Sequence, residues 1–96
     1  MLTIDPDDPE GVPYFAWDRP ITNAEIRSIL ATGPEIERIA WMSRILREAR
    51  VPDVWRYLGL RHDVLPNWER LRPTLGRRRA LWEYLIEGWR RDGLAD

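Results

Sequence analysis

Residues 34–50, PEIERIAWMSRILREAR, contain the clearest helical pattern of the chain. Apolar residues recur there with the 3.6-residue period of an α-helix and form one stripe, while charged residues fall on the opposite side. The stripe consists of Ile39, Met42, Ile45, Leu46 and Ala49, with Trp41 on its flank, and the opposite side carries Glu37, Arg44, Arg47 and Glu48. The pattern predicts a long amphipathic helix at the centre of the fold.

The segments next to this helix also predict helices. Before it, Thr22 and Glu25 have the spacing of a capping box, which begins a helix that Gly33 ends. After it, Pro52 fits the first turn of a short helix that closes at Gly59. Short helices on both sides of a long one are typical of a small helical domain.

The last part of the chain predicts one weak helix and one strong helix. Residues 60–72 carry a weak helical pattern that Pro66 interrupts. Residues 75–91 predict the last helix, with an apolar arc of Leu81, Trp82, Leu85, Ile86 and Trp89. We expect Leu81, Leu85 and Ile86 to be largely buried, together with Ile45 and Leu46 of the central helix. No stretch alternates with period two beside a hairpin turn, so we expect no sheet. The sequence therefore predicts an all-α fold, a small orthogonal bundle of four or five helices.

Residues 1–20 predict an extended arm that is rich in proline and aromatic residues. Proline lacks an amide donor and disfavours helix in the residue before it, and the arm also holds three large aromatic residues, Tyr14, Phe15 and Trp17. An exposed arm this apolar would aggregate, so it must pack on a surface. We expect it to fold back over the helical domain, residues 21–93, with Trp17 as its anchor and Asp18 and Arg19 at the rim. The alternative is that it docks into a partner.

The composition favours one domain inside the cell. Ninety-six residues leave no room for a second core, and the absence of cysteine excludes disulfides and thiolate metal sites. The first residues, MLTIDPDDPE, have neither the basic start nor the apolar core of a signal peptide, so we expect a cytoplasmic protein. The formal net charge is −1, but the basic residues, all arginine, concentrate after residue 37.

The residues that most often carry catalysis are scarce. His62 is the only histidine, and Ser28 and Ser43 are the only serines. No elbow motif, phosphate-cradling glycine loop or metal-ligand spacing surrounds them. We therefore expect no enzyme, no cofactor and no metal.

Nucleic-acid binding is an alternative that the arginines raise. Arg77, Arg78 and Arg79 form a basic cluster, and a helix, a turn at Val51-Pro52 and a second helix resemble the order of a helix-turn-helix. The second helix, however, offers only Arg56 as an obvious base reader, and the sequence pI is about 5.8. A DNA-binding transcriptional regulator therefore stands as the second hypothesis.

Three parts of the chain carry a family resemblance. They are PYFAWD at 13–18, ILREAR at 45–50 with DVWRYL at 53–58, and LRP at 71–73 followed by ALWEY at 80–84. Over residues 13–90 the chain resembles a family of small helical bacterial proteins that are often encoded beside AbiEii-type nucleotidyltransferases. Those neighbours are toxin-like enzymes, so the resemblance implies that the chain is a candidate antitoxin.

Together these observations predict a non-enzymatic protein-binding module. The resemblance suggests that it restrains a nucleotidyltransferase-type toxin. The predicted partner-binding residues are the aromatic residues of the arm and the basic cluster, namely Tyr14, Phe15, Trp17, Arg77, Arg78 and Arg79. We expect no membrane partner, because the longest apolar runs are only a few residues long.

Overall fold

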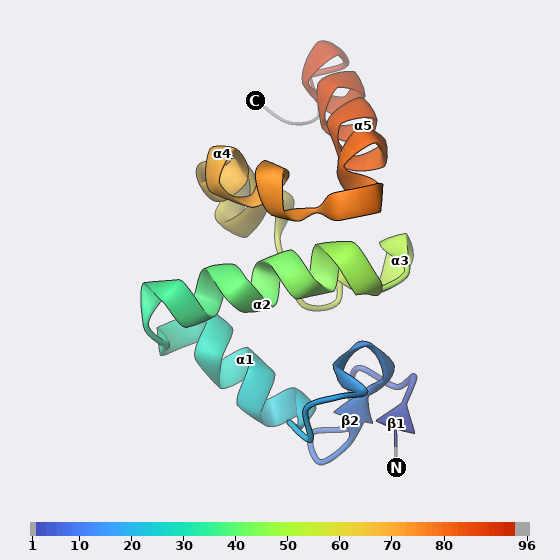
Figure 1. Cartoon of the computed structure of the whole chain (residues 1–96), viewed down its shortest axis with the longest axis vertical. Coiled ribbons are helices and arrows are strands. Elements are labelled where there is room, and N and C mark those ends of the chain that lie inside the picture. Colours follow the sequence, from blue (N-terminus) through green and yellow to red (C-terminus); the bar gives the residue numbers. More distant parts are fainter. Residues whose placement is uncertain (1, 94–96) are drawn as a thin grey trace.

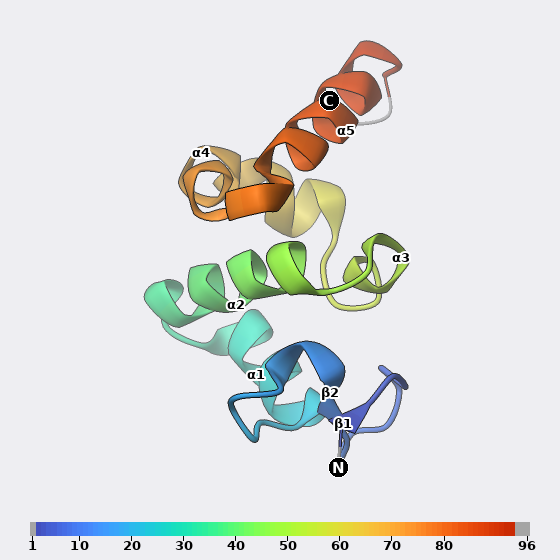
Figure 2. The same ribbon diagram turned by 45° about the vertical axis from the view of Figure 1, so that its right-hand side comes forward.

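Helix α2, Glu35–Glu48, lies in the middle of the molecule. The computed structural model describes residues 2–93, which extend over 40 × 24 × 22 Å. Helix α1, Asn23–Thr32, and the N-terminal segment lie on one side of α2 (Figures 1 and 2). Helices α4, Trp68–Leu71, and α5, Arg79–Arg91, lie on the other side. Most of these residues are helical, as the sequence predicts.

The predicted start of α1 is confirmed. The Thr22 hydroxyl accepts from the Glu25 amide at 3.2 Å, and the Glu25 carboxylate accepts from the Thr22 amide at 3.0 Å. The helix then ends at Gly33, whose amide donates to the Ile29 carbonyl. Side chains three residues apart decide the first end and a glycine marks the second, so local sequence locates both.

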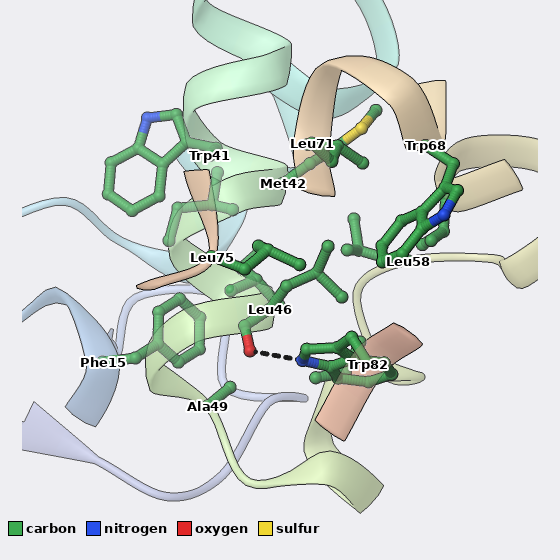
Figure 3. Packing of buried hydrophobic residues seen from close by; sticks show 14 of the residues in the cluster. Phe15, Trp41, Met42, Leu46, Ala49, Leu58, Trp68, Leu71, Leu75 and Trp82 are labelled. Carbon is green, nitrogen blue, oxygen red and sulfur yellow. Dashed lines mark hydrogen bonds between the residues drawn. The ribbon is translucent and has the colours of Figure 1, made fainter. Parts of the chain in front are cut away.

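The apolar stripe of α2 forms the centre of the core. Met42, Ile45, Leu46 and Ala49 are buried, and Trp41 on the flank is only 4% exposed. Figure 3 shows this stripe packed against residues from the N-terminal segment, α4 and α5. The buried cluster consists of Phe15, Ala16, Ile26, Trp41, Met42, Ile45, Leu46, Ala49, Val54, Leu58, Val64, Trp68, Leu71, Leu75, Trp82 and Ile86.

Residues 51–74 form short helical turns instead of long helices. Helix α3 is Val51–Val54, shorter than the predicted helix that reaches Gly59. The weak pattern over 60–72 becomes four successive turns, π-helical at Leu60–Val64, 3-10 at Leu65–Asn67, α-helical in α4 and 3-10 at Arg72–Thr74. Pro66 and Pro73 each remove an amide donor, so no continuous α-helical ladder runs through this part of the chain.

Helix α5 is the predicted last helix, but its buried face is narrower than expected. A 3-10 turn at Gly76–Arg78 precedes it. Ile86 is buried as predicted, and Trp82 is buried as well. Leu85 is only partly buried, and the prediction that Leu81 is buried is wrong, because 42% of it is exposed. Helix α5 lies at one end of the elongated molecule, where only one of its sides meets other elements (Figure 1). A narrow contact buries fewer positions than the apolar arc offers.

The expectation of no sheet is wrong in one place. Strands β1, Leu2–Thr3, and β2, Val12–Pro13, pair in parallel. Two residues per strand are too few to show an alternating pattern in the sequence. The connection between them, residues 4–11, is a loop that packs beside the start of α1.

Hydrogen bonds hold this N-terminal loop on α1. Asn23 is fully buried, and its side-chain amide donates to the carbonyls of Asp5 and Asp8 at 3.1 and 2.9 Å. Its side-chain oxygen accepts from the Tyr57 hydroxyl at 2.7 Å. The backbone amide of Asn23 donates to the Gly11 carbonyl at 2.8 Å. The loop therefore satisfies donors that the start of a helix otherwise leaves open.

The residues after the loop fold back on the core, but Trp17 is not the anchor that the sequence analysis expects. Phe15 and Ala16 are each 1% exposed, whereas Trp17 is 66% exposed. Tyr14–Ala16 form a 3-10 turn, in which residues three apart lie on the same side. Because Phe15 and Ala16 point into the core, the next position, Trp17, falls outside it.

Candidate partner-binding face

Trp17 is exposed, but Arg44 of α2 holds its ring in place. The guanidinium carbon of Arg44 lies 5.9 Å from the Trp17 ring centroid and also 5.9 Å from the Trp41 ring centroid. The same side chain donates from Nε to the Phe15 carbonyl at 2.8 Å and forms an ion pair with Asp18. Arg44 therefore contacts the chain before and after Trp17 as well as the exposed indole ring itself. Such a ring loses little conformational freedom when a partner covers it.

A second arginine extends this surface. The guanidinium carbon of Arg19 lies 5.4 Å from the ring centroid of Trp41, and Arg19 itself is exposed. Trp17, Arg19 and Arg44 therefore present one aromatic ring and two cations beside one another. Tryptophan and arginine are the residue types most enriched where interfaces gain their binding energy.

The basic cluster at residues 77–79 divides into one free residue and two structural ones. Arg77 is exposed, and it lines a cavity of about 410 Å³ together with Arg47. Arg78 instead donates from Nη1 to the carbonyls of Leu46 and Ala49 at the end of α2. Arg79 donates to the Glu83 carboxylate at 3.3 Å. Of the three predicted residues, Arg77 is the one left open to a partner.

The Arg78 contacts are reinforced by a tryptophan. The indole Nε1 of Trp82 donates to the Leu46 carbonyl at 2.8 Å, as the dashed line in Figure 3 shows. The last carbonyls of a helix have no partners within the helix, and a cation near them also interacts favourably with the helix dipole. Arg78 and Trp82 therefore attach the start of α5 to the end of α2.

The two predicted groups of site residues each lie beside an arginine of α2. Arg44 contacts the arm at Trp17, and Arg47 lines the cavity with Arg77. Residues three apart in a helix are neighbours on its surface. Arm and basic cluster therefore flank the same turn of α2, although they are far apart in sequence. We call this surface the α2 arginine face and define it by Trp17, Arg19, Arg44, Arg47 and Arg77.

The other two predicted aromatic residues are structural. Phe15 is in the core, edge-on to Tyr14 and Tyr57 at centroid distances of 5.6 and 5.1 Å. The Tyr14 hydroxyl donates to Asp53 at 2.6 Å and accepts from the Arg50 amide at 2.8 Å. Burial raises the pKa of Tyr14, and its hydrogen bond lowers the pKa of Asp53. These contacts join the arm to α3.

Arg19, Arg44 and Arg47 are missing from the predicted partner-binding residues. Arg19 is expected at the rim of the arm, and Arg44 and Arg47 are assigned to the charged side of the central helix, which is normally solvated. A pair of arginines three apart on that side is a weak signal, because it does not say which other segments lie beside it. The folded arm and the 75–78 turn supply that information.

His62 and Arg56, considered for catalysis and DNA reading, each contact an acidic residue. His62 is exposed and contacts the neighbouring Asp63 at 3.0 Å. Within residues 2–93, no three histidine, aspartate or glutamate side chains are close enough to hold a metal ion. Helix α3 is a single turn, and Arg56, the expected base reader, forms an ion pair with Asp7 at 2.7 Å.

Comparison with protein-family models, with curated proteins and with solved structures finds no match for this chain. Within the described part of the chain, none of the helices combines the length and apolar character that crossing a bilayer requires. The candidate site therefore depends on the geometry of the α2 arginine face.

Proposed function

We propose that the protein is a non-enzymatic protein-binding module that binds its partner through the α2 arginine face. This proposal depends on the contrast between two aromatic side chains of the arm. Phe15 is 1% exposed, whereas Trp17 is 66% exposed. A large ring kept outside the core costs apolar burial that folding otherwise gains. Binding to a partner recovers that burial.

We further propose that the partner is a nucleotidyltransferase-type toxin, which the protein restrains as an antitoxin in the cytoplasm. This step depends on the resemblance carried by residues 13–18, by 45–50 with 53–58, and by 71–73 with 80–84. The first two stretches contain Trp17 and Arg47, so the resembling segments include part of the α2 arginine face. Within this proposal the helices are an orthogonal bundle that serves as a rigid base, and residues 1–20 are the arm that presents Trp17.

Co-expression with a nucleotidyltransferase encoded beside the gene tests the proposal. The wild-type protein should co-purify with the enzyme and restore the growth of cells that express it. Trp17→Ala should weaken the complex by about 2 kcal/mol or more, which is roughly 30-fold in Kd, because a central tryptophan contributes this much at an interface. Isothermal titration of the purified proteins measures the change.

Tyr84→Ala is the matched control. Tyr84 is also a large exposed aromatic residue, at 72%, but it lies on α5, on the other side of α2 from the arm. We expect this variant to bind like the wild type. A complex that survives Trp17→Ala and is lost with Tyr84→Ala would place the interface on α5 and contradict the proposed face.

A further inference from the structure

A cavity lies at the basic end of the α2 arginine face. Its volume is about 410 Å³, and its walls come from the end of α2 and from the turn before α5. The lining residues are Arg47, Glu48, Leu75, Gly76, Arg77 and Arg78. Three guanidinium groups line this cavity, whereas a second cavity has Arg27 alone and a third has Arg72 and Arg90.

None of these three cations has an anionic partner within residues 2–93, and only Arg78 is held by backbone carbonyls. Arg78 is held by the carbonyls of α2, so its position is fixed. Arg47 and Arg77 are exposed, and neither forms an ion pair with a described acidic residue. By contrast, Arg44 and Arg79 each pair with a carboxylate. Arg47 and Arg77 therefore keep their donors free for an external anion.

The turn leaves room for that anion. Gly76 has a φ of +55°, a conformation that residues with a side chain rarely adopt. The position where a Cβ would lie is open, with no heavy atom within 4 Å from any described residue beyond the two chain neighbours. An incoming group can therefore approach the backbone between the two arginines.

The surroundings favour a separate carboxylate over a phosphate backbone. Glu48 forms part of the wall, and the sequence pI is about 5.8. A nucleic acid brings a phosphate at every step and favours a continuous basic surface. The planar guanidinium fork binds a single carboxylate with two parallel hydrogen bonds. One carboxylate in this cavity adds a single negative charge beside Glu48, whereas a nucleic-acid strand adds one at every nucleotide.

The apolar part of the face lies one turn away. Arg44, beneath Trp17, and Arg47, at the cavity, are separated by three residues, which is about 4.5 Å along a helix axis. A partner segment that carries both an acidic and an apolar residue is therefore suited to this surface. We propose that the cavity binds the carboxylate of an acidic segment of a protein partner, adjacent to an apolar contact at Trp17. This inference depends on the proposed protein-binding function and names the chemistry of the partner.

Titration with a defined acidic peptide tests the inference without the toxin. The probe is an acetylated tetraglutamate amide, and the readout is the NMR signals of the arginine Nε–Hε groups, assigned with Arg47→Gln and Arg77→Gln. The peptide should shift both signals. The double variant Arg47→Gln with Arg77→Gln should bind it at least tenfold more weakly. The charge-matched control Arg90→Gln with Arg91→Gln should bind it like the wild type.

Two outcomes overturn the inference. One is equal weakening in the double variant and in its charge-matched control, which would show only a general charge effect. The other is that a random-sequence DNA duplex shifts the same two signals at a lower concentration than the peptide does. Its affinity would then fall steeply with salt, as phosphate contacts require. That result would identify a nucleic-acid surface.

The peptide and toxin experiments together show which of the two proposals is wrong. If the nucleotidyltransferase does not bind but the peptide shifts Arg47 and Arg77, the toxin is the wrong partner and the carboxylate site stands. If the enzyme binds equally well to the Arg47→Gln with Arg77→Gln variant and the peptide causes no shift, the carboxylate site is wrong and the proposed function stands.

Discussion

Polar groups are fully hydrogen-bonded around Asn23, whereas some of those on the α2 arginine face have no acidic partner within residues 2–93. Asn23 is fully buried, and its side chain donates to two carbonyls of the N-terminal loop and accepts from Tyr57. A buried amide with all these bonds stabilises one arrangement of the chain, since losing a partner leaves an unsatisfied group.

The α2 arginine face has the reverse character. Arg47 and Arg77 have no acidic partner within residues 2–93, and the Trp17 ring is largely exposed. Groups of this kind contribute little to the free energy of folding. The difference indicates that folding and partner binding use separate residues, even where these are close in sequence.

The largest expected contrast is inside the arm. Phe15→Ala should lower the free energy of unfolding by about 3–5 kcal/mol, because it removes a fully buried ring. Trp17→Ala should cost at most about 1 kcal/mol, the value of an exposed contact between a cation and a ring. Urea unfolding followed by circular dichroism measures both. Similar losses for the two variants would mean that Trp17 also belongs to the core.

A smaller contrast separates two neighbouring arginines. Arg78→Ala should lower the free energy of unfolding by about 1.5–3 kcal/mol, since it removes charged hydrogen bonds to the last carbonyls of α2. Arg77→Ala should change it by no more than about 0.5 kcal/mol. The same unfolding measurement tests this pair. If Arg77→Ala destabilises the protein as much as Arg78→Ala, Arg77 is not free for a partner.

The smallest expected effect appears only at alkaline pH. Burial raises the pKa of Tyr57 from 10.0 to about 12. The folded state therefore favours the neutral phenol, and this contribution is complete below pH 10 and is lost as the pH rises towards 12. Tyr57→Phe should consequently show a shallower loss of stability between about pH 10 and 12. Thermal melts across this range measure the slope.

Tyr84→Phe is the control for this prediction. It removes a phenol from a residue that is 72% exposed, so the slope should match that of the wild type. A wild-type slope in Tyr57→Phe as well would assign the alkaline loss to other groups, of which Tyr14 is the first candidate, because burial also raises its pKa.

The sequence predicts the structure best where that structure depends on residues that are close together in the chain. The capping box of Thr22 and Glu25 and the apolar stripe of α2 need no knowledge of distant segments, and both are confirmed. Trp17 and Leu81 are predicted wrongly for the opposite reason. An apolar side chain shows that burial is favourable, but distant segments decide which apolar side chains are covered.

The same reasoning applies to the candidate site. Trp17 and Arg77 are named from the sequence because their residue types are typical of interfaces. Arg78 has the same residue type as Arg77, yet it is used to cap α2. Only the position of the 75–78 turn at the end of α2 distinguishes the two, and no local pattern encodes that position.

The exposure of Trp17 also gives the protein a natural optical probe. All six tryptophans lie within the described residues. Trp41, Trp68 and Trp82 are buried, Trp55 and Trp89 are partly buried, and Trp17 alone is mostly exposed. A soluble fluorescence quencher therefore reaches the indole of the α2 arginine face before the others. Any molecule that covers this face shields that emission, so its arrival is visible in the unlabelled protein.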